Sequence, residues 1–127
     1  LREVSIFETY CPVARADVER LSHLLLMKIL PSVVEEDIES FGEGLNQMQT
    51  LGFKKIEIEL QGEVVRNVMV ALRERAFGAG LSSFGPTVYA LARGRNHARE
   101  LSRIAKGFCE TVIISSVSRS GALVTSE

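Results

Sequence analysis

The chain has 127 residues, of which 15 are basic and 16 acidic, so its net charge at neutral pH is −1. This balance excludes the broad electrostatic attraction that draws strongly basic proteins to nucleic acids or to anionic membranes. The hydrophobic fraction of 46% is ordinary for a globular protein, and no apolar run approaches the roughly 20 residues of a membrane helix. With two cysteines, which make no disulfide framework, these properties predict one cytoplasmic domain over residues 1–127.

The first third of the chain is patterned as helices. A capping box at Ser5-Ile6-Phe7-Glu8 predicts a short helix to about Tyr10. Asp17 is a good N-cap for the next helix, whose leucines recur at helical spacing until Pro31 ends or kinks it. A second capping box, Ser32-x-x-Glu35, predicts that a further helix starts at once, with Gly52 at its end. Its predicted core face consists of Val34, Ile38, Phe41, Leu45 and Met48.

The second half mixes helix and strand patterns. Residues 53–60 fit a strand or a helix and are left undecided, whereas residues 62–75 have helical spacing. Strands are predicted at 79–83 and 87–92, joined by the tight connection Phe84-Gly85-Pro86. A helix capped by Asn96 follows, with an apolar face at Ala98, Leu101, Ile104 and Ala105. A third strand is predicted at 111–117, and residues 122–125 form a last strand or a frayed end.

This order of elements predicts an α+β fold in which helices pack on an antiparallel sheet. The segment with the strongest functional signal lies between the two central strands. Three glycines within eight residues, Gly78, Gly80 and Gly85, allow close approach of the backbone. Ser82, Ser83 and Thr87 add hydroxyls that can donate to a phosphate or a carboxylate. On local physics alone, glycines beside a strand more often serve a tight hairpin or a bulge than a ligand.

The stretch GAGLSSFGPTVYAL, residues 78–91, resembles the third glycine-rich motif of the GHMP superfamily of small-molecule kinases. Its Ser-Ser-Phe-Gly-Pro-Thr-Val-Tyr part is more similar still to a non-kinase branch of that superfamily, the archaeal synthases that use phosphoribosyl pyrophosphate. Glu8-Thr9-Tyr10-Cys11-Pro12 and Pro31-Ser32-Val33-Val34-Glu35 share this resemblance, which therefore spans most of the chain. The resemblance implies a ferredoxin-like sandwich, the carboxy-terminal half of a larger two-domain protein.

For function, the resemblance implies condensation of an aromatic acid with phosphoribosyl pyrophosphate, with loss of carbon dioxide and pyrophosphate, on a route to methanopterin. Carried over residue by residue, the substrate- and phosphate-binding positions are Gly78, Gly80, Ser82, Ser83, Gly85 and Thr87. The resemblance implies no cofactor within these residues and leaves Mg²⁺ open for the complete enzyme. Its expected partners are the two substrates, an amino-terminal half and further copies of the chain, without nucleic acid or membrane.

Two other functions stay open at this point. A GHMP kinase of the homoserine or pantoate type would place the same loop near the γ-phosphate of ATP. The bulk of Ser82-Ser83-Phe84, where many of the kinases carry smaller residues, argues against ordinary ATP-dependent phosphorylation. A non-catalytic small-molecule-binding or dimerising module is the third alternative, because such folds serve many roles.

The remaining polar residues favour structural roles. His23 and His97 lack a second ligand at helical spacing, so no metal site is predicted. Cys11 and Cys109 are expected to be buried, inert thiols. Two charged groups are expected to be solvated helix faces: the carboxylates Glu35, Glu36, Asp37 and Glu39, and the arginines Arg95, Arg99 and Arg103.

Overall fold

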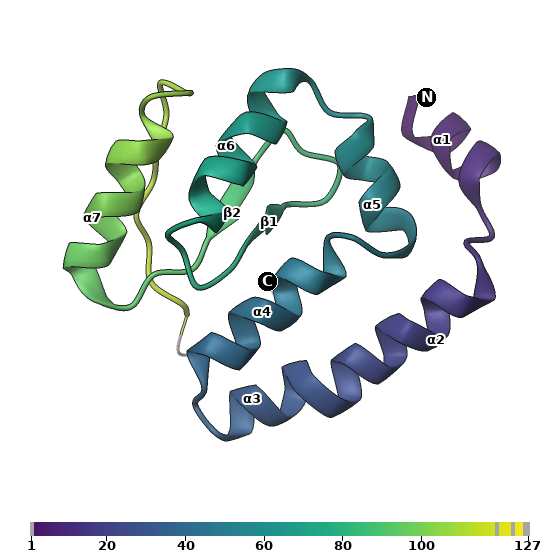
Figure 1. The fold of residues 1–127 in the computed structure, drawn as a ribbon, viewed down its shortest axis with the longest axis horizontal. Helices are drawn as coiled ribbons and strands as arrows, with labels where there is room; N and C mark the ends of the chain where they lie inside the picture. The colour runs from purple at the N-terminus through teal and green to yellow at the C-terminus, as the bar shows by residue number, and fades with distance from the viewer. Residues whose placement is uncertain (1, 119, 123, 126–127) are drawn as a thin grey trace.

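The computed structural model describes residues 2–118, 120–122 and 124–125. Its helices are α1 (Arg2–Tyr10), α2 (Arg15–Leu24), η1 (Leu25–Ile29), α3 (Leu30–Val34), α4 (Ile38–Met48), α5 (Gly52–Glu59), α6 (Glu63–Arg73) and α7 (Gly94–Ala105). Strands β1 (Ala79–Leu81) and β2 (Val88–Ala90) pair antiparallel, with Gly80 opposite Tyr89. Figure 1 shows α4 between this hairpin and the long helical run from α2 to α3. The predicted α+β class is confirmed.

Helices α6 and α7 build the main core against the hairpin. Val68 and Leu72 of α6 meet Leu101 and Ala105 of α7 over the fully buried Ala79. This arrangement confirms the helix predicted at 62–75 and the predicted apolar face of the last helix. The cap of α7 differs from the prediction, because Arg93 rather than Asn96 precedes its first turn. Within the described residues, no helix combines the length and the apolar character needed to cross a membrane.

Side chains of α4 close the outer edge of β1. The Asn46 side-chain oxygen accepts a hydrogen bond from the Ala79 amide at 3.0 Å, and that of Gln49 accepts one from the Leu81 amide at 2.9 Å. Buried backbone amides require such partners, and an open strand edge invites pairing with another chain. Two amide side chains on one face of a helix thus take the place of a neighbouring strand along β1.

The buried face of α4 differs from the predicted apolar stripe. None of its five large residues is fully buried, and Val34, which precedes α4, is 84% exposed. The buried positions are instead Gly42, Gly44 and Gln49. The reason is the closeness of the contact: Gly42 lies against the backbone of Phe77 and Gly78, and Gly44 lies against the Ile29 side chain. Large side chains cannot enter these contacts and therefore flank them.

Pro31 changes the hydrogen bonding of the long helical run without ending it. The run continues from Arg15 to Val34 through the π-helical turn η1, in which the Leu30 amide donates to the Leu25 carbonyl. A proline lacks an amide hydrogen and its ring crowds the carbonyl four residues earlier, which favours such a local adjustment. Ser32 therefore lies inside α3, where its buried hydroxyl donates to the Ile29 carbonyl, and the predicted Ser32 capping box is wrong.

The segment left undecided by the sequence, residues 53–60, is helical in the structure. Gly52 does not close the preceding helix but opens α5 with a φ of 53°. Its amide donates to the Asp17 carboxylate at 3.2 Å, which ties α5 to α2. Asp17 is thus a contact between helices rather than the predicted N-cap.

The predicted third strand does not form. Residues 111–117 are irregular, with Ile113 81% exposed and Val117 89% exposed. Only Val112 of this segment packs against the α6–α7 core. A β-branched sequence becomes a strand only beside an edge that can share its hydrogen bonds, and here the sheet has two strands within the described residues. Of the predicted tail element at 122–125, residue 123 lies outside the described residues and the others are irregular.

Asp37 is the N-cap of α4 and gives the fold a defined pH dependence. Its carboxylate accepts from the Ser40 amide at 3.1 Å, and hydrogen bonds from Ser40 lower the pKa of Asp37 below its ordinary value. The ionised cap is therefore stabilising above the pKa of the unfolded chain, about 3.9, and this contribution is lost as pH falls through the lower pKa of the folded state.

We expect Asp37→Asn to keep the cap and to remove this titration, since asparagine caps helices as well as aspartate does. The melting temperature of the wild type, measured relative to that of the variant, should be constant near pH 6 and should fall as the pH drops below about 4. Thermal unfolding of both proteins across this range is the measurement. A difference that stays constant with pH would show that the Asp37 carboxylate is not the titrating group.

Candidate functional site

The turn between β1 and β2 forms the exposed part of the candidate site. The Gly85 amide donates to the Ser82 carbonyl at 2.8 Å, and the Ser82 amide donates to the Thr87 carbonyl at 2.9 Å. Ser83 has a φ of 46° and Gly85 a φ of 75°, a conformation that side-chain-bearing residues rarely adopt. Ser82, Ser83 and Thr87 are exposed. The turn thus presents three hydroxyls to the solvent.

Several hydrogen-bond donors of this turn are free. Across the part of the chain that the structure describes, the hydroxyls of Ser82, Ser83 and Thr87 and the amides of Ser83 and Phe84 have no protein partner. Hydroxyls donate readily to oxyanions, and neighbouring free amides in a turn form concave anion sites. The arrangement is chemically suited to a phosphate or a carboxylate.

The structure separates the six predicted site residues into two groups. Gly78 and Gly80 are buried, whereas Ser82, Ser83, Gly85 and Thr87 lie in the turn. A Cβ at Gly78 would come 2.8 Å from the Gly42 backbone, and one at Gly80 would come 2.5 Å from the Tyr89 hydroxyl. Both glycines therefore have a packing role where α4 meets the hairpin. Contact of Gly78 and Gly80 with a ligand in the complete protein stays a prediction.

An aromatic cluster anchors the turn to two helices. Phe84 lies edge-on to Phe7 of α1 and Phe53 of α5, with ring centroids 5.4 and 5.7 Å away, while Phe7 and Phe53 stack at 4.6 Å. Edge-to-face and offset-stacked pairs contribute about 0.5–1.5 kcal/mol each beyond their buried area. Beside the cluster is a hollow of about 360 Å³ lined by Glu3, Ile6, Leu60, Gln61, Gly62, Phe84, Gly85 and Pro86.

Polar residues of α5 and the link after it hold the turn from below. Lys54 donates to the Ser83 carbonyl at 3.0 Å, and Gln61 donates to the Phe84 carbonyl at 2.8 Å. Lys54 also forms an ion pair with Glu57. Sequence reasoning missed all three because residues 53–60 were left undecided. Assigned as a helix, this segment would have placed Lys54 and Glu57 on one face, three residues apart, with Gln61 just beyond its end.

A second polar pair lies under the hairpin. Burial lowers the pKa of Arg73 and raises the pKa of Tyr89, and each charge partly offsets the shift of the other. The Arg73 Nε atom is buried without a hydrogen-bond partner among the described residues. Tyr89 reaches the Gln49 side chain at 3.5 Å. The Arg73–Tyr89 pair thus links α6 to β2, the strand that follows the turn.

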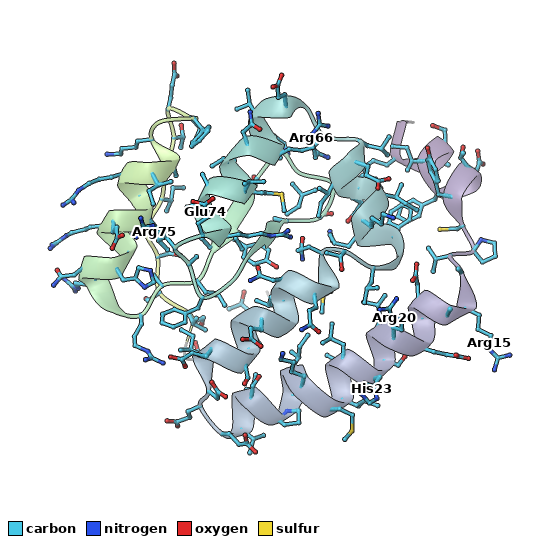
Figure 2. All side chains as sticks on the ribbon, viewed as in Figure 1. Arg15, Arg20, His23, Arg66, Glu74 and Arg75 are labelled. Carbon is cyan, nitrogen blue, oxygen red and sulfur yellow. The ribbon has the colours of Figure 1, made fainter. Side chains whose placement is uncertain are left out.

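The two histidines differ in their surroundings. His97 Nδ1 accepts from the Arg93 amide at 3.2 Å, so Nε2 carries the hydrogen and donates to the Arg75 carbonyl at 2.9 Å. The predicted structural role of His97 is confirmed. His23 is exposed on α2 close to Arg20 (Figure 2), beside a hollow of about 690 Å³ between α2 and α4. No group of histidines, cysteines and carboxylates in the described residues could hold a metal ion.

The expectation of buried thiols is wrong, because Cys11 and Cys109 are both exposed. Cys11 directly follows α1, and Cys109 lies four residues after the end of α7. The charged groups have the predicted solvated character. Glu35, Glu36 and Glu39 are exposed and Asp37 serves as a cap. Arg95, Arg99 and Arg103 are likewise exposed.

Comparison with known proteins places the turn in a recognised domain. The family model described as GHMP kinases C terminal matches residues 29–111, which include α4, α5, the hairpin and α7. Three curated relatives are each named beta-ribofuranosylphenol 5'-phosphate synthase. That of Methanocaldococcus jannaschii is 51% identical over 89 residues, which are 70% of this chain and 27% of the relative.

The relative from Methanothermobacter thermautotrophicus is 52% identical over 91 residues, covering 71% of this chain and 28% of its own length. That from Archaeoglobus fulgidus is 42% identical over 117 residues, covering 88% of this chain and 36% of its own length. The chain thus spans between about a quarter and a third of these synthases. Because the family model covers more than half of the chain, the chain belongs to the GHMP kinase carboxy-terminal domain family.

Proposed function

We propose that the chain is the carboxy-terminal domain of a synthase that condenses a 4-substituted benzoate with phosphoribosyl pyrophosphate. The observation that carries this proposal is the turn at residues 82–87, with its free hydroxyl and amide donors, within a region about half identical to named synthases. The name of these relatives refers to a ribosylated phenol, which favours 4-hydroxybenzoate over 4-aminobenzoate as the aromatic substrate. The fold and the family are compatible with either.

The proposed reaction forms a bond between C1 of the ribose and the ring carbon that bears the carboxylate. The bond from C1 to the pyrophosphate oxygen breaks, and the carboxylate leaves as carbon dioxide, so that the phenol, carbon dioxide and pyrophosphate balance the two substrates. Donors placed where negative charge develops on the leaving pyrophosphate lower the barrier, and orientation of the two reacting carbons adds further rate. We assign Ser82, Ser83 and Thr87 to binding and orientation, and no residue as a base.

The rest of the proposed enzyme supplies most of the substrate contacts. We propose that the complete protein has an amino-terminal half, which brings it to the length of its relatives and holds the substrate phosphates. In this proposal Mg²⁺, where the reaction requires it, binds with these phosphates. The complete enzyme is a cytoplasmic homo-oligomer. The outer edge of β2 has no strand partner among the described residues, and Val112 of the aliphatic segment 111–117 packs against the same core as Val88 and Ala90 of β2. A strand added at this edge would allow that segment to pair and would complete a ferredoxin-like sandwich.

The alternative function is a small-molecule kinase, which the description of the matching family favours. Ligand binding separates the two. We expect the complete protein to bind phosphoribosyl pyrophosphate in the absence of ATP, measured by isothermal calorimetry, and to release carbon dioxide when 4-hydroxybenzoate is added. Binding of ATP without binding of phosphoribosyl pyrophosphate would replace the synthase with the kinase. Binding of neither would leave the non-catalytic module.

A further inference from the structure

The face of α5 beneath the turn carries a compact polar network. Lys54 and Glu57 project from this face three residues apart, and Gln61 follows two residues after the end of the helix. Lys54 donates to the Ser83 carbonyl at 3.0 Å, and the Gln61 side chain donates both to the Phe84 carbonyl at 2.8 Å and to the Glu57 carbonyl at 3.0 Å. Two consecutive carbonyls of the turn are thus held by side chains of one short segment.

The ion pair in this network is largely removed from water. The Glu57 side chain is 7% exposed and that of Lys54 is 22% exposed. Removing two charges from water costs several kcal/mol per ion, and their attraction often only balances this cost. A buried pair of this kind therefore adds little net stability relative to apolar residues of the same size. The contribution of the ion pair is instead geometric, because the Glu57 carboxylate holds the Lys54 ammonium at one position, next to the Ser83 carbonyl.

The turn needs such a restraint. Ser83 and Glu36 are the non-glycine residues with positive φ in the described part of the chain, and the φ of Ser83 is 46°. A non-glycine residue is strained in this region and stays there only where the surrounding structure holds it. The contact from Lys54 acts on the carbonyl of that same residue. The backbone conformation at Ser83 therefore sets the directions of the free Ser83 hydroxyl and of the free Ser83 and Phe84 amides.

We propose that Lys54, oriented by Glu57, is a positioning residue that keeps the Ser82–Gly85 turn in its anion-binding conformation. The inference rests on the proposed function, because the ligand it serves is the phosphorylated or carboxylated substrate of that reaction. Lys54 acts through the turn and contributes order to the free donors rather than a contact with the reacting atoms. The substrate class assigned to this turn is an oxyanion bound by hydroxyls and amides.

The test uses the complete protein with three substitutions: Lys54→Met, Lys54→Arg and Lys55→Met. Lys55 is the matched control, because it neighbours Lys54 on α5 but is 60% exposed and faces Glu59 instead of the turn. Hydrogen exchange of the 82–87 segment, followed by mass spectrometry, reports the order of the turn without any ligand. Calorimetric binding of phosphoribosyl pyrophosphate and steady-state kinetics report whether the ordered turn contributes to substrate binding and to turnover.

We expect Lys54→Met to speed exchange of the segment about tenfold and to raise both Kd and KM about tenfold, which corresponds to about 1.4 kcal/mol of binding. The value of kcat should change less than twofold, since loss of the Lys54 contact weakens capture of the substrate by the free turn and leaves the donors themselves in place once the substrate is bound. Lys54→Arg should restore most of the loss and Lys55→Met should match the wild type. Exchange or Kd in Lys54→Met equal to that in Lys55→Met would overturn the positioning role. Failure of the wild type to bind phosphoribosyl pyrophosphate would instead overturn the proposed function, and exchange would still decide whether Lys54 orders the turn.

Discussion

Gly42→Ala is expected to lower the free energy of unfolding by about 3 kcal/mol or more, the upper part of the range for overpacked sites. A Cβ at Gly42 would lie 2.0 Å from the Phe77 carbonyl oxygen and 2.9 Å from the Gly78 nitrogen. Both are backbone atoms that no side-chain rotation can move aside. The helix α4 would have to shift away from the hairpin, and its Asn46 and Gln49 side chains would leave the β1 amides.

Chemical denaturation of the variant gives the change in stability, and hydrogen exchange at Ala79 and Leu81 shows where it arises. Gly62→Ala is the matched control, because a Cβ at Gly62 meets no atom within 4 Å. That control should change stability by less than about 1 kcal/mol. Equal stability of the two variants would mean that α4 does not contact β1 as closely as described.

Removing the three hydroxyls of the turn is expected to lower kcat/KM of the complete enzyme by at least about 100-fold. The variant is Ser82→Ala/Ser83→Ala/Thr87→Val, which keeps the backbone amides and alters no hydrogen bond of the folded domain, since these hydroxyls have no protein partner among the described residues. A hydrogen bond to a charged group contributes about 1.5–3 kcal/mol, and each 1.36 kcal/mol is tenfold in rate. Shared contacts with one ligand keep the total below the sum of the three.

The control for this experiment removes three exposed hydroxyls from the irregular tail, as Thr111→Val/Ser115→Ala/Ser116→Ala. It should retain activity within about twofold of the wild type. Melting temperatures of both variants should equal that of the wild type, which separates a loss of binding from a loss of fold. If the turn variant kept wild-type kcat/KM, the hydroxyls would have no role in the reaction.

The family resemblance of residues 78–91 and the hairpin that contains them were predicted correctly because their signals are local. The resemblance of residues 78–91 to the GHMP motif agrees with the family and with its synthase members. The strands on either side and the tight connection were also correct, since β1 and β2 lie within the predicted 79–83 and 87–92. Which residues of the motif meet a ligand stays a prediction, because the same glycines that suit a ligand also suit the close packing of α4 on β1.

Predictions that depended on long-range partners fared worse. The stripe of large residues on α4 was predicted to be core, but the helix packs by Gly42 and Gly44 because it lies so close to β1 and Ile29. The strand at 111–117 had the right composition and lacked an edge with which to pair. In the same way, the role of Lys54 could not be foreseen while its segment was undecided between helix and strand.

From the sequence by itself come the α+β class, the hairpin, the helices at 62–75 and after residue 93, and the hydroxyl-rich turn with its family. The structural features follow from turn chemistry, residue propensity and periodicity, which act over a few neighbouring residues, whereas the family follows from the resemblance of residues 78–91 to a known motif. The tertiary structure alone decided which face of α4 is buried, which side chains close the edge of β1, and that Lys54 and Gln61 hold the turn. Each of these depends on segments that are distant in the sequence, with hydrogen-bond partners 23 to 33 residues apart, and local patterns carry no information about such pairs.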